Sequence, residues 1–311
     1  MKSTAFDSNN LRGTLLPITT PFSSGAIDHD ALRFNIDRWA TTGISGYVVL
    51  GSTGERVHLN ESEYLAVIET TRGIVQGSMS FIVGAGQQST RGTIDEIAKA
   101  AAAGADAVLV LTPHYYRSAI TQDTLVTFYK AVADAAPVPL LLYSMPALTG
   151  IKIEPDTIAR LSEHPNIIGV KDSSNDIAGF KRTVDLCPAE FAVMTGNGTI
   201  FLEAMEAGAT GAILAVGCVV PELCVEIDRS FRNGELERAR LLQQILTPLA
   251  AAVTTRFGIG GLKAALDLAG YRGAEVRAPL PEPNENARAE IAALLVNAKK
   301  SLTQTRKDPE L

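Results

Sequence analysis

Short apolar runs alternate with longer amphipathic stretches from residue 13 to about residue 230. Eight of these runs are apolar enough to form buried strands, at residues 13–20, 46–50, 81–86, 106–112, 139–144, 167–171, 191–196 and 211–216. The stretches between them carry helical spacing; in residues 89–104, Ser89 or Thr90 is suited to begin a helix and Gly104 to end it. Strands that are apolar on both faces and alternate with helices indicate a parallel sheet covered by helices. Eight such units are the number that closes a (β/α)8, or TIM, barrel.

An open, doubly wound sheet is the other architecture with this alternation. It would require a glycine-rich phosphate-binding turn after its first strand, and the residues found there, TTPFSSG at 19–25, do not form one. After about residue 220 the strands stop, and helical spacing continues in residues 221–234, 235–257, 261–270 and 285–302. We therefore expect a barrel domain at residues 1–225 and a C-terminal helical domain at residues 226–311, with a frayed tail at KDPEL (307–311).

The composition is that of a chain that folds around an ordinary hydrophobic core. Of its 311 residues, 46% are hydrophobic and 20% are charged. The net charge of −6 provides no basic field to attract nucleic acid or an anionic membrane. The N-terminal MKSTAFDSNN lacks the apolar stretch of a signal peptide, and the longest apolar run, residues 212–220, is too short to cross a bilayer. We expect a cytoplasmic protein, or an already processed chain, that binds neither nucleic acid nor membrane.

Histidine and cysteine spacing argues against a metal site. The four histidines and three cysteines are scattered and form no zinc motif, and an odd number of cysteines argues against a disulfide framework (His29, His58, His114, His164, Cys187, Cys218 and Cys224). We therefore expect no metal and no histidine-activated nucleophile.

The residues at the carboxyl ends of the strands carry the candidate chemistry, because a β/α barrel places its active site there. After the second strand comes GSTGE at 51–55, in which the Ser52 and Thr53 hydroxyls lie between glycines. This loop is suited to hold a carboxylate, and the alternative is an ordinary glycine turn with a serine cap. No lysine follows in the position that a nucleotide-binding P-loop requires.

Tyr143 and Lys171 end the fifth and sixth strands, which are neighbours in the predicted barrel. Tyr143 is either a core aromatic residue or a proton carrier, and Lys171 is either the first solvated residue after its strand or a buried amine. Burial disfavours an ammonium ion, so a buried lysine supplies neutral amine that can attack a carbonyl and form a Schiff base. A carboxylate cradle, an amine and a phenol together describe a site for a 2-oxo acid.

Four motifs in this order and spacing, GSTGE, TPHYY, YSMPALTG and GVKDSS, resemble the pyruvate-dependent class I aldolase family of dihydrodipicolinate synthases and N-acetylneuraminate lyases. The resemblance extends over essentially the whole chain. It implies a (β/α)8 barrel with C-terminal helices, a homotetramer, and catalysis with no metal or organic cofactor. The implied substrates are pyruvate and an aldehyde or 2-oxo acid.

The resemblance also implies roles for single residues. Lys171 corresponds to the Schiff-base lysine, Tyr143 to the catalytic tyrosine, and Ser52 and Thr53 to the residues that hold the pyruvate carboxylate. Tyr115 corresponds to a tyrosine that reaches into the active site of a neighbouring subunit. The remaining expected substrate-binding residues are Gly51, Ser173, Gly196, Asn197 and Ile213.

Within the family, YSMPALTG, SEHPNIIGVKDSSND and AAVTTRFGIGGLKAAL are most similar to the 4-hydroxy-2-oxoglutarate aldolases, whereas GSTGE and Ala147–Leu148 are similar to the neuraminate lyases. Leu148 stands where the dihydrodipicolinate synthases typically have an arginine. We expect cleavage of 4-hydroxy-2-oxoglutarate to pyruvate and glyoxylate. The alternatives are condensation of pyruvate with aspartate semialdehyde, cleavage of a sugar acid, and a non-catalytic sensor or scaffold, against which Lys171 and Tyr143 argue.

Overall fold

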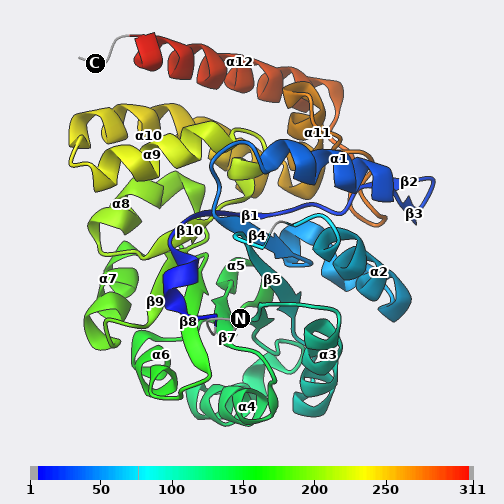
Figure 1. Cartoon of the computed structure of the whole chain (residues 1–311), viewed down its shortest axis with the longest axis vertical. Helices are drawn as coiled ribbons and strands as arrows, with labels where there is room; N and C mark the ends of the chain where they lie inside the picture. Colours follow the sequence, from blue (N-terminus) through cyan, green and yellow to red (C-terminus); the bar gives the residue numbers. More distant parts are fainter. Residues whose placement is uncertain (1–5, 76, 308–311) are drawn as a thin grey trace.

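A closed barrel of eight parallel strands forms the centre of the computed structural model, which describes residues 6–75 and 77–307 (Figure 1). Each predicted run overlaps one strand of the barrel, so the prediction of a TIM barrel is confirmed. The barrel closes because β1 pairs with both β4 and β10. The strands are β1 (Gly13–Pro17), β4 (Gly46–Val49), β5 (Ser80–Ala85), β6 (Ala107–Leu111), β7 (Leu140–Ser144), β8 (Ile167–Asp172), β9 (Ala192–Thr195) and β10 (Gly211–Ile213).

Helices cover the outside of the barrel (Figure 1). They are α1 (His29–Trp39), α2 (Glu61–Arg72), α3 (Thr90–Ala102), α4 (Gln122–Ala135), α6 (Pro155–Ser162), α7 (Ile177–Leu186) and α8 (Phe201–Glu206), with a single turn α5 (Pro146–Thr149) after β7. The side chain of Ser89 accepts a hydrogen bond from the Gly92 N–H and so caps α3. Gly104 has φ +97°, a left-handed conformation that favours glycine after a helix.

The barrel strands bury side chains on both faces, as their continuous apolar character predicts. One cluster fills the barrel interior and includes Leu15, Val48, Ile82, Leu109, Leu141 and Met194. A larger cluster lies between the strands and the surrounding helices. Tyr143 and Ile213 belong to the interior cluster. Both lie near the carboxyl ends of their strands, β7 and β10.

The C-terminal part of the chain is helical and lies along one side of the barrel, next to α1 (Figure 1). It contains α9 (Pro221–Arg232), α10 (Leu236–Ala251), α11 (Gly258–Ala269) and α12 (Glu285–Lys307). The expected boundary near residue 225 falls inside α9, which also contacts β1, and the division into two domains stays a prediction. Residues 308–311 of the expected frayed tail lie outside the described residues.

Two features differ from the expected elements. A hairpin of β2 (Phe22–Ser23) and β3 (Ala26–Ile27) follows β1, and its strands are too short to produce a sequence pattern. The single helix expected at residues 235–257 is instead α10 followed by a π-helical turn at Ala252–Arg256. None of the helices in the described part of the chain combines the length and apolar character that a membrane span requires.

Candidate active site

Lys171 and Tyr143 lie side by side at the ends of β8 and β7, where they are register partners. The Lys171 Nζ atom is 3.4 Å from the Tyr143 hydroxyl and 4.4 Å from the centre of its ring. Each residue is only 4% exposed. Lys171 is therefore not a solvated residue at a strand end: it is a buried amine in contact with a phenol.

The GSTGE loop brings Ser52 to the same point. The Ser52 Oγ atom is 3.4 Å from the Tyr143 hydroxyl, and Thr53 is buried next to it in the chain. The loop turns sharply, because Leu50 and Glu55 at its two ends have φ values of +60° and +54°. It also passes so close to β5 that a Cβ atom at Gly84 would lie 2.2 Å from the Leu50 carbonyl oxygen. Glycine at residue 84 is what allows the loop to cross the barrel mouth.

Polar neighbours lower the pKa of the Tyr143 hydroxyl. Burial has the largest single effect and would raise this pKa, but it is outweighed by the positive charge of Lys171 together with hydrogen bonds from Ser52, Lys171 and Ser173. Tyr129, which is buried without such neighbours, has its pKa raised by burial. A phenol whose proton is held less tightly than usual, and which touches an amine, is suited to transfer protons.

The turn after β9 packs directly against Lys171. A Cβ atom on Gly196 would lie 2.7 Å from the Lys171 Cε atom and 2.0 Å from the Ser173 Oγ atom, so only glycine fits there without displacement. Asn197 is engaged in its own loop: its Oδ1 atom accepts from the Thr199 N–H at 3.0 Å. Ile213 is fully buried in the barrel interior.

A cavity of about 340 Å³ lies next to Tyr143. Of the residues expected from the sequence, Gly51, Ser52 and Tyr143 line it. Lys171 does not line it, although its Nζ atom is 3.4 Å from the Tyr143 hydroxyl. Other apolar residues that line this cavity were not predicted from the sequence; they come from distant segments and include Leu111, Ile259 and Leu280.

Tyr115 lies apart from this group. It is 75% exposed, and its ring packs edge-on against the neighbouring Tyr116 with 5.0 Å between the ring centres. Its main-chain N–H donates to the Gln88 side chain. Within one chain, Tyr115 therefore does not contact Lys171 or Tyr143.

The structure also contains a second buried lysine, which the sequence analysis did not identify. Lys263 on α11 is fully buried, and its Nζ atom is 2.6 Å from Glu55 Oε1 and donates to the carbonyl oxygens of Thr20 and Glu275, at 2.8 and 2.5 Å. Burial lowers the pKa of Lys263, and the Glu55 carboxylate opposes this shift. Two carbonyl acceptors and an ion-paired carboxylate surround this Nζ atom, which describes a structural cation rather than a nucleophile.

This pair joins the loop that carries Ser52 to the C-terminal helices. The signals for it in the sequence are a lone lysine inside the apolar stretch GIGGLKAAL and the acidic residue that ends GSTGE. No group of three or more histidine, cysteine, aspartate or glutamate side chains gathers as a metal site within residues 6–75 and 77–307.

The fold and the arrangement at the barrel mouth define a β/α-barrel enzyme with a buried amine and phenol at the ends of adjacent strands. Residues 10–298 match the Dihydrodipicolinate synthetase family, and the chain belongs to that family. It is thus an enzyme, a carbon–carbon lyase of the pyruvate-dependent aldolase class. The alternative of a non-catalytic sensor or scaffold is set aside.

Individual relatives are similar over nearly their whole length. The 4-hydroxy-tetrahydrodipicolinate synthase of Hyphomonas neptunium is 34% identical over 288 residues, which cover 92% of this chain and 98% of the relative. A monomeric dihydrodipicolinate synthase variant has a TM-score of 0.89 and 32% identity, over 94% of this chain and 98% of its own. The YagE prophage protein of E. coli K12, solved in complex with pyruvate, has a TM-score of 0.86 and 28% identity, over 93% of this chain and 98% of its own. These relatives do not support the finer expectation of a 4-hydroxy-2-oxoglutarate aldolase.

Proposed function

We propose that the protein joins pyruvate to an aldehyde, or cleaves the corresponding product, through an imine between pyruvate and Lys171. The observation that carries this proposal is the buried contact of 3.4 Å between Lys171 Nζ and the Tyr143 hydroxyl beside an open cavity. The complex of the related YagE with pyruvate supports the choice of 2-oxo acid. The reaction needs no metal or organic cofactor, because the protonated imine itself withdraws electrons.

The chemistry begins when the Lys171 nitrogen attacks the C2 carbonyl of pyruvate to give a carbinolamine. Loss of water leaves a protonated imine, and removal of a proton from C3 gives an enamine. The C3 atom then bonds to the aldehyde carbon, whose oxygen takes up a proton, and water hydrolyses the imine to release the product and restore the amine. In this scheme Tyr143 carries protons to and from the oxygen atoms, while Ser52 and Thr53 hold the carboxylate of pyruvate.

Of the specific reactions, condensation of pyruvate with aspartate semialdehyde has the support of the relatives, because the similar chain from Hyphomonas neptunium is a 4-hydroxy-tetrahydrodipicolinate synthase. Cleavage of 4-hydroxy-2-oxoglutarate to pyruvate and glyoxylate is the second candidate. Leu148 lines the cavity and weakens the first candidate, because leucine cannot form a charge-assisted pair with the carboxylate of aspartate semialdehyde; glyoxylate carries a carboxylate as well, so Leu148 by itself does not distinguish the two.

Borohydride reduction in the presence of pyruvate tests the imine. Mass spectrometry should locate a pyruvate-derived mass on the peptide that contains Lys171. Lys171→Arg should abolish both the adduct and turnover, because a guanidinium stays protonated. Lys263 serves as the internal control, because it is also buried but is ion-paired with Glu55. An adduct on Lys263, or on any lysine other than Lys171, would overturn the assignment.

We further propose a homotetramer in which Tyr115 reaches the site of a neighbouring subunit. The exposed pair of Tyr115 and Tyr116 supports this proposal, since aromatic side chains are enriched at interfaces. Family membership does not decide the assembly, because one relative is a monomeric variant. Light scattering should give four times the chain mass of 33.0 kDa; full activity at the mass of one chain would contradict the proposal. A cytoplasmic location stays a prediction from composition.

A further inference from the structure

Part of the wall of the cavity that Ser52 and Tyr143 line is apolar. Leu148 follows β7, Ile259 begins α11, and Leu280 lies in the segment between α11 and α12. These side chains come from three separate parts of the chain and line one cavity. Its volume of about 340 Å³ is at the small end of the range for ligand sites.

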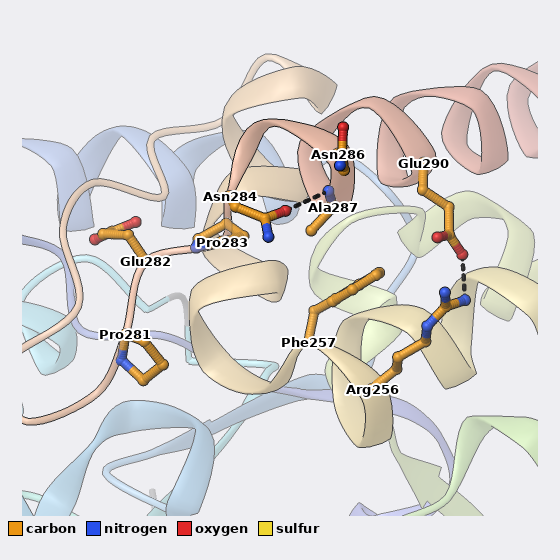
Figure 2. A pocket seen from close by; sticks show the side chains of 9 residues that line it. All are labelled: Arg256, Phe257, Pro281, Glu282, Pro283, Asn284, Asn286, Ala287 and Glu290. Atoms are coloured by element: carbon orange, nitrogen blue, oxygen red, sulfur yellow. Dashed lines mark hydrogen bonds and ion pairs between the residues drawn. The ribbon is translucent and has the colours of Figure 1, made fainter.

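The two C-terminal segments of this wall are packed firmly together. A Cβ atom on Gly260 would lie 2.4 Å from the Pro281 carbonyl oxygen, so the main chain next to Ile259 is in close contact with the main chain next to Leu280. Phe257 and Pro281, from the same two segments, line a separate cavity of about 420 Å³ (Figure 2). The apolar wall therefore belongs to ordered backbone.

The cationic side chains that line the site cavity already have partners. Arg56 forms an ion pair with Glu96, and His58 Nδ1 is 3.3 Å from Glu55 Oε2. His114 Nδ1 lies 3.1 Å from a main-chain carbonyl oxygen. Each of these three side chains is thus engaged by at least one partner, the Nε atom of Arg56 is buried without one among the described residues, and none of the three belongs to the apolar part of the wall.

We infer that the second substrate is an aldehyde with an uncharged, apolar chain, and that such aldehydes react more efficiently than aspartate semialdehyde. This inference rests on the proposed imine and adds the chemical class of its partner. Tyr143 lines this cavity and contacts Lys171, so an aldehyde that reaches the imine through the cavity places its chain against Leu148, Ile259 and Leu280. A carboxylate there would lose its water without gaining a charged hydrogen bond, which disfavours it by about ten- to a hundredfold.

Steady-state rates with pyruvate and a panel of aldehydes test the inference. The probes are 3-methylbutanal and benzaldehyde as apolar aldehydes, and aspartate semialdehyde and glyoxylate as charged ones. We expect kcat/KM for the better apolar aldehyde to exceed that for aspartate semialdehyde by at least about tenfold. A higher kcat/KM for aspartate semialdehyde would overturn the inference and leave the reaction of the relatives in place.

Leu148→Arg supplies the missing cation at the cavity wall. Leu148 is 64% exposed, so this change should not prevent folding. The ratio of kcat/KM for aspartate semialdehyde to that for 3-methylbutanal should rise by about tenfold or more. Leu186→Arg is the matched control, because Leu186 is an exposed leucine on α7 that does not line the cavity. If the ratio of kcat/KM for aspartate semialdehyde to that for 3-methylbutanal is the same in Leu148→Arg and Leu186→Arg, the inference is contradicted as well.

The two proposals fail in different ways. If borohydride traps no pyruvate on Lys171, the proposed function is wrong whatever the aldehyde panel shows. If pyruvate is trapped on Lys171 but charged aldehydes are preferred, only the inference about the second substrate is wrong.

Discussion

Replacing Lys263 with methionine should lower the free energy of unfolding by about 3–5 kcal/mol, the usual cost of removing one partner from a buried ion pair. Methionine keeps an unbranched stem in the same space. The variant would leave the Glu55 carboxylate, itself 2% exposed, without its cation. The carbonyl oxygens of Thr20 and Glu275 would lose their donor as well.

The size of this effect depends on the charge left behind, so a second variant isolates it. Adding Glu55→Gln to Lys263→Met removes the unpaired charge. It also keeps a side-chain acceptor for the main-chain N–H of Arg277, whose nitrogen lies 3.0 Å from Glu55 Oε2. The double variant should therefore be more stable than Lys263→Met alone by about 1 kcal/mol or more. Because Glu55 ends the loop that carries Ser52, Lys263→Met should also raise the KM for pyruvate.

Urea unfolding at pH 7, followed by circular dichroism and by tryptophan fluorescence, measures the change as a shift in the midpoint. Lys299→Met is the control, since this exposed lysine on α12 makes one long contact with the Ala269 carbonyl oxygen, at 3.3 Å. It should change the stability by no more than about 0.5 kcal/mol. A loss below about 1 kcal/mol for Lys263→Met, or a double variant less stable than the single one, would refute the reasoning about the buried pair.

Three further predictions concern the residues around Lys171. Tyr143→Phe should lower kcat by about 10²–10⁴-fold with an unchanged circular dichroism spectrum, because the ring still packs while the proton carrier is lost; a change below about threefold would make Tyr143 a packing residue. Ser52→Ala removes a hydrogen bond that lowers the pKa of Tyr143, so this pKa should rise and the alkaline limb of the pH–rate profile should move to higher pH; a shift to lower pH would contradict this. Gly196→Ala should impair imine formation, because its Cβ atom would displace the Lys171 side chain; normal borohydride trapping would show that the turn can move.

The eight strands and their order could be predicted from the sequence because the residues within each strand carry its signal. A strand buried on both faces must be apolar throughout, and a helix must repeat its apolar positions at a different spacing. The same logic placed Tyr143 next to Lys171, since adjacent parallel strands in a closed barrel end at the same level. The cap of α3 at Ser89 is equally local, because it involves residues only three apart.

The features that the sequence did not reveal depend on contacts between distant segments. The hairpin of β2 and β3 has strands of two residues, too short for any periodicity, and the π-helical turn at Ala252–Arg256 interrupts a run whose spacing suits one continuous helix. The pairing of Glu55 with Lys263 is of the same kind. Either residue alone is compatible with an exposed position, and only the packing of α11 against the loop after β4 makes both buried.

The candidate site has one part that the local sequence predicts and another that depends on contacts between distant segments. Lys171, Tyr143 and Ser52 stand at strand ends or in a glycine-bounded loop, so their positions follow from chain-local patterns and the number of strands. The apolar part of the cavity wall combines Leu148, which follows β7, with Ile259 and Leu280, which line the cavity only because the C-terminal region packs against the barrel. The identity and position of the reacting groups were therefore determined by local sequence. The shape and polarity of the cavity around them were decided by tertiary packing, because packing brings together side chains that are far apart along the chain.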